Sequence, residues 1–193
     1  YLVFFNVVLS YGMETAFFRF YNNEENKKKV ISTATISLFW STIGFLVLFL
    51  LFRKDLALWS KINVEYIVFT IWILALDALA IIPFSKIRAE SRPIKYAVIK
   101  ISNVVINLLL NIFFLAFLPN WAANTDNMFI QTIYHEDFQI GYIFVSNLIA
   151  SLFTLLFVLP DYFKIKWQFD TDLWKKMMQY GLPILVAGIA FAI

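Results

Sequence analysis

Residues 64–84 read VEYIVFTIWILALDALAIIPF, and this stretch decides the fold class. Beyond Glu65 near its start, Asp77 is its only charged residue. An α-helix needs about 20 apolar residues to cross the ~30 Å hydrocarbon core of a bilayer, and this stretch is long enough. Strands of a membrane β-barrel alternate in polarity over about ten residues, which this continuous run does not do. The stretch therefore predicts a transmembrane helix.

Five further apolar segments share this character. The six segments lie near residues 1–20, 30–52, 64–84, 97–118, 138–160 and 180–193. Hydrophobic residues make up 61% of the 193 residues and charged residues 15%, whereas soluble domains carry about a quarter charged residues. The first residue is Tyr1, and the last segment is too short to cross a bilayer. We therefore expect an all-α, polytopic transmembrane bundle over residues 1–193, a fragment with five full spans and the start of a sixth.

The distribution of Lys and Arg predicts the orientation of these spans. The connections after the first, third and fifth segments, together with Arg19 and Lys100 at the adjoining segment ends, hold 13 of the 16 Lys and Arg residues, and the connection after the second holds the other three. Cytoplasmic connections of membrane proteins carry an excess of Lys and Arg. We therefore expect a multi-pass protein of the bacterial cytoplasmic (inner) membrane whose basic connections face the cytoplasm.

Two carboxylates fall inside predicted spans. Ionisable groups there are costly and usually functional, which makes Glu14 and Asp77 candidates for a substrate or ion pathway. Counted from the basic ends of their spans, both lie roughly 9–10 Å deep at 1.5 Å per residue, so we expect them at equal depth. Arg19 and Lys86 stand at span ends. They either extend to the interface or pair with the two acids as a gate.

The fourth span carries a polar stripe. Asn103, Asn107 and Asn111 are spaced four residues apart, and Lys100 lies one turn before them, so all four share one helix face. An amide facing lipid would lack a hydrogen-bond partner, so this face is expected to look into the bundle. Two interpretations remain open, namely hydrogen bonds between helices and the lining of a polar pathway.

Several catalytic signatures are absent from the sequence. It has no cysteine, no GxxxxGK[ST] phosphate loop, no HExxH motif and no GxSxG motif. The only histidine, His135, lies in the connection 119–137 with Asp126, Glu136 and Asp137, and we interpret it as a solvated loop residue rather than a metal ligand. We expect binding and gating rather than catalysis, with no metal, no cofactor and no nucleic-acid partner.

Three patterns along the chain carry a family resemblance. Residues 11–20 read YGMETAFFRF, residues 83–96 read PFSKIRAESRPIKY, and residues 180–183 read YGLP. In order, spacing and expected sidedness, the chain resembles the polysaccharide-exporting (O-antigen-type) branch of the multidrug/oligosaccharidyl-lipid/polysaccharide flippase superfamily. Glu14, Arg19 and Arg88 fall on positions that resemble family motifs, whereas Asp77 and the Asn stripe do not.

The resemblance implies a two-lobed protein around a central cavity, of which this chain is most of the first lobe, approximately helices two to seven. It implies alternating access that flips a lipid-linked oligosaccharide, a polysaccharide precursor, from the cytoplasmic to the outer leaflet. The partners would be the bilayer, this substrate and the second lobe of the same chain.

Four cations near the cytoplasmic mouth are expected to attract the substrate's pyrophosphate: Lys86, Arg88, Arg92 and Lys100. Glu14 or Asp77 would couple transport to a proton or sodium gradient. The alternatives are a multidrug exporter of the same superfamily, a membrane-bound glycan polymerase or ligase, and a structural membrane scaffold.

Overall fold

The computed structural model describes residues 2–124, 130 and 133–192, and the regular elements in this part of the chain are all helical. The elements are α1 (Leu2–Ser10), α2 (Met13–Asn23), α3 (Lys27–Leu51), α4 (Arg53–Ser60), α5 (Val64–Ala89), α6 (Pro93–Ile112), the π-helix η1 (Phe113–Phe117), α7 (Leu118–Asn124), the 3₁₀-helix η2 (Glu136–Phe138), α9 (Gln139–Phe163) and α10 (Thr171–Ala192). The predicted all-α class is confirmed.

Four helical stretches among the described residues are long and apolar enough to cross a membrane: α3, α5, α9 and the continuous helix Pro93–Asn124. The last of these joins α6, η1 and α7 end to end. This length and composition fit a membrane-embedded protein. The sixth apolar segment belongs to a longer helix than the sequence suggests, because α10 already begins at Thr171.

The first apolar segment is not one uninterrupted helix, and this corrects the sequence prediction. The helix breaks at Tyr11 and Gly12, whose φ angles are +33° and +71°. Glycine adopts this left-handed region at little cost, whereas the same conformation is strained for Tyr11. The break cannot be predicted from the hydrophobicity of the segment. Its two parts, α1 and α2, have 9 and 11 residues, each too short to span a bilayer alone.

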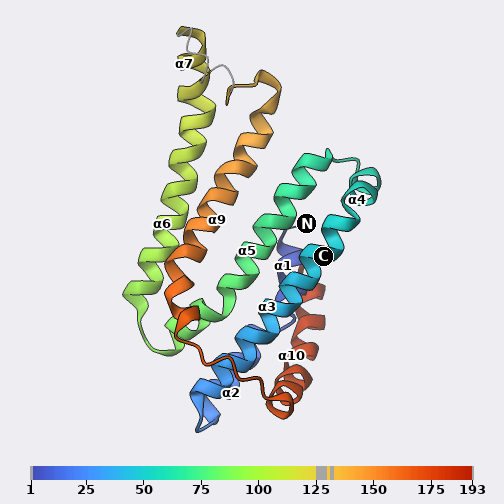
Figure 1. Cartoon of the computed structure of the whole chain (residues 1–193), viewed down its shortest axis with the longest axis vertical. Helices are drawn as coiled ribbons and strands as arrows, with labels where there is room; N and C mark the ends of the chain where they lie inside the picture. The colour runs from blue at the N-terminus through green and yellow to red at the C-terminus, as the bar shows by residue number, and fades with distance from the viewer. Residues whose placement is uncertain (1, 125–129, 131–132, 193) are drawn as a thin grey trace.

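Helix α5 occupies the centre of the bundle. It packs against α3 on one side and α9 on the other, and α6 lies beside α9 (Figure 1). Helix α10 contacts both α1 and α2, and all three contact α3, so they form the other side of the molecule. Helix α6 buries only Ile99 and leaves most of its apolar side chains exposed, as expected for a helix in contact with lipid.

Two apolar clusters hold these helices together at the end of the molecule where α2 lies. Met13, Phe17, Leu38 and Met177 connect α2, α3 and α10. The second cluster contains Phe84, Ile87, Ile99 and Val158 and connects α5, α6 and α9. Between membrane helices, close van der Waals packing of such side chains supplies much of the attraction. Both clusters support the walls of the cavity described below.

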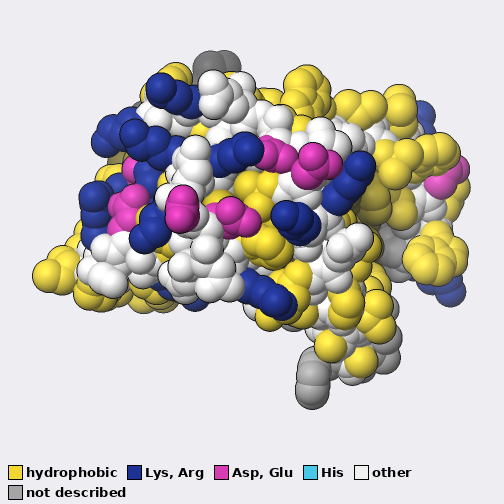
Figure 2. Space-filling model, turned by 90° about the horizontal axis from the view of Figure 1, so that it is seen from below, with side chains coloured by type: hydrophobic (Ala, Val, Ile, Leu, Met, Phe, Trp, Pro, Cys, Tyr) yellow, Lys and Arg dark blue, Asp and Glu magenta, His cyan; other side chains and the backbone are white. Residues whose placement is uncertain are grey.

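Charged side chains gather at this same end of the molecule. Figure 2 views the end from below, where α2, the turn between α5 and α6, and the connection between α9 and α10 meet, and shows Lys and Arg side chains interspersed with acidic ones. The connection between α9 and α10 is held against α3. Gln168 N–H donates to the Ser32 hydroxyl (2.9 Å), and Asp170 N–H donates to the Thr33 hydroxyl (3.2 Å).

Asp170 gives this attachment a pH dependence. Its carboxylate accepts the Leu173 N–H (2.9 Å) and pairs with Lys29, and both interactions hold the pKa of Asp170 below its ordinary value. A carboxyl with a lowered pKa stabilises the fold above its ordinary pKa of about 4 and loses this contribution as the pH falls through the lowered value. Asp170→Asn is therefore expected to reduce the loss of thermal stability below about pH 4. Asp172→Asn, an exposed change in the same turn of α10, is the control, and identical pH profiles for the two variants would contradict this assignment.

Candidate functional site

A polar cavity of about 530 Å³ lies among five helices. Helices α1 and α2 form one wall, α6 and α9 form the other, and α5 runs between them. Its polar lining consists of Asn6, Ser10, Glu14, Asp77, Arg88, Tyr96, Lys100, Asn103, Asn147, Ser151 and Thr154, and apolar side chains complete it. A membrane bundle would leave these groups without partners against lipid, so a hydrated or ligand-filled space suits them.

Arg88 and Glu14 form an ion pair at the charged end of this cavity. The Arg88 guanidinium carbon also lies 4.8 Å from the centroid of the Phe18 ring and 5.6 Å from that of Tyr96. The Ser85 hydroxyl donates to the Glu14 carboxylate at 3.4 Å. The side chains of Arg88 and Glu14 are 40% and 42% exposed, so the pair is open to exchange its partners.

Asp77 lies deeper, where its carboxylate accepts a hydrogen bond from Ser151 of α9 (2.8 Å). Glu14 contacts Ser85 and Arg88, which follow Asp77 on α5 by eight and eleven residues, or roughly 12–16 Å at 1.5 Å per residue. The predicted equal depth of the two acids is therefore wrong. The break at Gly12 is the reason, because it places Glu14 in the first turn of α2, at the charged end.

The Asn stripe faces the bundle, as predicted. Asn103 donates to the Thr154 hydroxyl (2.9 Å), and Asn107 donates to the Asn147 side-chain oxygen (3.3 Å). Asn111 donates to the backbone carbonyl of Asn107 (2.9 Å). Only Asn103 of the three lines the cavity. Hydrogen bonds between helices are thus observed for Asn103 and Asn107, and Asn103 also lines the polar cavity.

Lys86 does not pair with Glu14 or Asp77 as the gate hypothesis suggested. Its ammonium group lies 3.3 Å from one carboxylate oxygen of Asp161, and that of Lys95 lies 2.8 Å from the other. Asp161 is only 5% exposed. This cluster joins α5, α6 and α9. Asp161 escaped the sequence analysis, where the only signal was an acid after Pro160 at the end of an apolar run.

Arg19 and Arg92 also lie away from the cavity lining. The Arg19 guanidinium carbon is 4.2 Å from the centroid of the Tyr180 ring, so this side chain packs on α10 and not beside an intramembrane acid. The Arg92 side chain pairs with Glu90 at 3.3 Å and is largely exposed. Of the four cations expected to attract substrate, only Arg88 and Lys100 line the cavity.

Lys100 is positioned by an aromatic ring. Its ammonium group lies 4.7 Å from the centroid of Phe84, and it makes no salt bridge within the described ranges. An ammonium over an aromatic face is stabilised by about 0.5–2 kcal/mol. Lys100 therefore offers a charge to a ligand without first giving up an acidic partner, whereas Arg88 must exchange Glu14.

The described residues contain no group of three or more His, Asp or Glu side chains placed to hold a metal ion. His135 is exposed, and its backbone N–H donates to the Tyr142 hydroxyl (2.8 Å). Asp126 of the same connection lies outside the described residues.

Models of protein families, curated proteins and solved structures contain no match to this chain. The cavity, its charges and its place among apolar helices are thus the basis for a functional proposal.

Proposed function

We propose that the chain is part of a membrane transporter that flips a lipid-linked oligosaccharide, the precursor of a surface polysaccharide, to the outer leaflet. The observation that carries the proposal is a polar cavity with Arg88 and Lys100 at its charged end and amide and hydroxyl groups beyond them. Such a substrate has a diphosphate, sugar hydroxyls and a hydrocarbon tail. The cavity would hold the first two while the tail stays in the bilayer.

The diphosphate fits the charged end of the cavity. Guanidinium and ammonium groups make short, charge-assisted hydrogen bonds with phosphate oxygens. The Glu14 carboxylate holds Arg88 in place without substrate, and a phosphate would replace it. Asn103, Asn147 and Ser151 then offer amide and hydroxyl groups to the sugars.

Asp77 is suited to couple this movement to an ion gradient. It lies along the same cavity, and its only hydrogen bond from a side chain in the described residues comes from Ser151. An intramembrane carboxylate that faces a polar space can bind a proton or a sodium ion. Release of that ion would shift the equilibrium between the state open to the cytoplasm and the state open to the outside.

In this proposal the chain is most of one lobe of a two-lobed transporter, and α3, α5, α9 and the helix Pro93–Asn124 cross the membrane. Its basic end would face the cytoplasm of a bacterium, since 13 of the 16 Lys and Arg residues belong to the three connections on that side and the adjoining segment ends. Substrate would thus meet Arg88 and Lys100 first. This direction matches flipping from the cytoplasmic leaflet by alternating access.

A multidrug exporter of the same superfamily is the second candidate. One observation favours it: Asp77 lines the cavity without a salt bridge among the described residues. A site for an amphipathic cation would require such a carboxylate. The two cations at the mouth act against such a ligand. A binding measurement separates the two functions.

Arg88→Gln and Lys100→Gln are each expected to weaken the binding of a polyprenyl diphosphate to the purified chain in detergent. A hydrogen bond to a charged group contributes about 1.5–3 kcal/mol, so each change should raise the Kd by about ten- to a hundredfold. Arg92→Gln is the matched control, since Arg92 lies outside the cavity lining. Equal effects of all three changes would contradict the proposal. Tighter binding of a lipophilic cation, lost in Asp77→Asn, would favour the exporter.

A further inference from the structure

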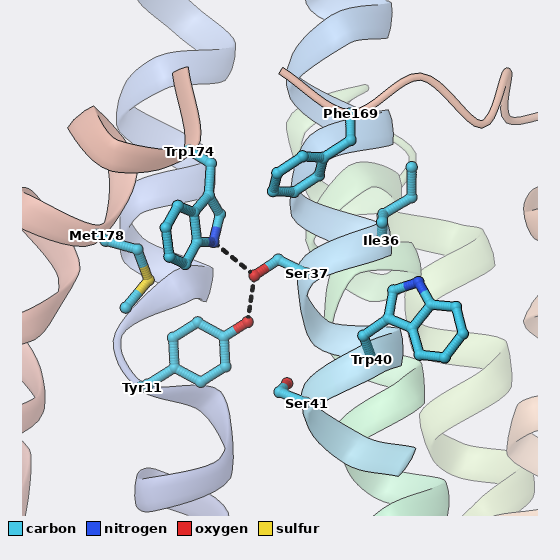
Figure 3. Close-up of a pocket in the computed structure, with 8 residues that line it drawn as sticks. All are labelled: Tyr11, Ile36, Ser37, Trp40, Ser41, Phe169, Trp174 and Met178. Atoms are coloured by element: carbon cyan, nitrogen blue, oxygen red, sulfur yellow. Dashed lines mark hydrogen bonds between the residues drawn. The ribbon is translucent and has the colours of Figure 1, made fainter. Parts of the chain in front are cut away.

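A second cavity, of about 610 Å³, lies between α3 and the start of α10 (Figure 3). Tyr11 closes it where the first helix breaks, and Ser37 lies at its centre. Its remaining wall is mostly apolar, made by Ile36, Trp40, Phe169, Trp174 and Met178. None of these residues lines the polar cavity, so this is a separate site.

The hydroxyl groups of this second cavity and the indole N–H of Trp174 already have partners. The Ser37 hydroxyl lies 2.7 Å from the Tyr11 hydroxyl and accepts the indole N–H of Trp174 (2.8 Å), as Figure 3 shows. The Ser41 hydroxyl donates to the backbone carbonyl of Leu38 (3.1 Å). A ligand therefore meets mainly aromatic and aliphatic surface. That surface suits a hydrocarbon chain.

The level of the cavity in the bundle also suits a lipid. Tyr11 precedes Glu14 by only three residues, which extend over at most about 11 Å, so the cavity lies near the Glu14–Arg88 pair at the charged end. Trp40 and Phe169 are 63% and 46% exposed at its mouth. Exposed aromatic side chains next to a charged end are typical of the level where lipid headgroups meet acyl chains.

Two lysines flank this mouth in sequence. Lys166 precedes the segment that holds Trp167 and Phe169, and Lys175 follows Trp174. Both lysines are exposed, and neither makes a salt bridge within the described ranges. Basic pockets between membrane helices recognise anionic lipid headgroups. We propose that this cavity binds one acyl chain of an anionic phospholipid, whose phosphate lies at Lys166 and Lys175.

Quenching of Trp174 by brominated lipid tests this proposal. The other five tryptophans are all exposed, and replacing them with Phe leaves Trp174 as the only indole. One of these changes, Trp40→Phe, lies in the cavity wall and keeps an aromatic ring there. This protein is placed in phosphatidylcholine nanodiscs that contain about one-tenth of either brominated phosphatidylglycerol or brominated phosphatidylcholine. We expect the anionic lipid to quench Trp174 at least twofold more strongly, because bromine then sits in the cavity.

Two changes on α3 provide a matched pair. Ser41→Phe fills the cavity and should abolish the difference between the two brominated lipids. Gly44→Phe adds the same ring one turn away, where nothing lies within 4 Å of the added Cβ, and should preserve the difference. Equal quenching by both lipids in the starting protein, or equal behaviour of the two variants, would overturn the proposal.

A third variant covers the case in which Ser41→Phe fails to fold. Lys166→Gln combined with Lys175→Gln leaves the cavity unfilled, and should remove the preference for the anionic lipid while quenching by the neutral lipid persists. A preference that survives this double change refutes the headgroup assignment. Quenching that falls as the number of chains per nanodisc rises would show that a second copy of the chain, and not lipid, covers the cavity.

Discussion

Asp161→Ala is expected to destabilise the protein by about 3–5 kcal/mol, the usual cost of removing one partner from a buried ion pair. Asp161 is nearly buried and holds Lys86 and Lys95 from two other helices. Without this carboxylate, Lys86 keeps its charge in a place where its side chain is only 13% exposed. The ends of α5, α6 and α9 should then separate. Thermal unfolding of the purified chain in detergent measures the effect.

Glu90→Ala is the matched control for this change. Glu90 lies 3.9 Å from Lys86 and is partly exposed, so its loss should cost less than about 1 kcal/mol. Replacing the pair together, as Lys86→Met with Asp161→Leu, should recover most of the stability, because no unpaired charge is then buried in that pair. If Asp161→Ala costs no more than Glu90→Ala, the cluster does not hold the three helices together.

Gly12→Ala is expected to prevent α10 from packing against α1 and α2. A Cβ at Gly12 would lie 2.1 Å from the carbonyl oxygen and 2.7 Å from the carbonyl carbon of Gly181. Both are backbone atoms, so no side-chain rotation removes the overlap. The left-handed φ of +71° adds roughly 1–2 kcal/mol for any residue with a Cβ. Together with the cost of the overlap, usually about 1–3 kcal/mol or more, this is a large fraction of the stability of a typical domain.

The yield of monodisperse protein in size-exclusion chromatography measures this loss. Gly44→Ala is the control, because a Cβ there meets nothing within 4 Å and alanine favours the helix by about 0.5–1 kcal/mol. Gly181→Ala should lie between them, since its Cβ would approach the Tyr11 carbonyl oxygen at 3.1 Å. A Gly12→Ala protein as stable as the Gly44→Ala protein would mean that α10 does not pack closely on the break.

The long apolar helices could be predicted because burial in lipid depends on composition over a window. The segments predicted at 30–52, 64–84 and 138–160 correspond to α3, α5 and α9 within a few residues at most ends. The direction of the Asn stripe was likewise predictable, since residues four apart share a helix face and an amide needs a partner. Both features depend on local sequence.

The break at Gly12 and the partners of the charged groups could not be predicted in the same way. A glycine within an apolar run is compatible with a continuous helix, and only the close approach of Gly181 explains its conformation. Arg88 and Glu14 are 74 residues apart, and Lys86 and Asp161 are 75 apart. Those pairs depend on how the helices cross, and neither the count of charges in each connection nor the depth of a residue in its span predicts helix crossing.

The length of the helix Pro93–Asn124 has a consequence for the membrane around it. Its 32 residues extend for about 48 Å, whereas the hydrocarbon layer measures about 30 Å and helices rarely tilt beyond about 40°. Even at that tilt, part of the helix projects from the bilayer. Its apolar segment, residues 97–118, extends for only about 33 Å, so the projecting parts are the more polar ends of the helix. Asn103 and Asn107 fasten the helix to α9, so a change in tilt alters the width of the polar cavity. Because bilayer thickness affects the tilt of a spanning helix, we expect ligand binding in the polar cavity to depend on that thickness.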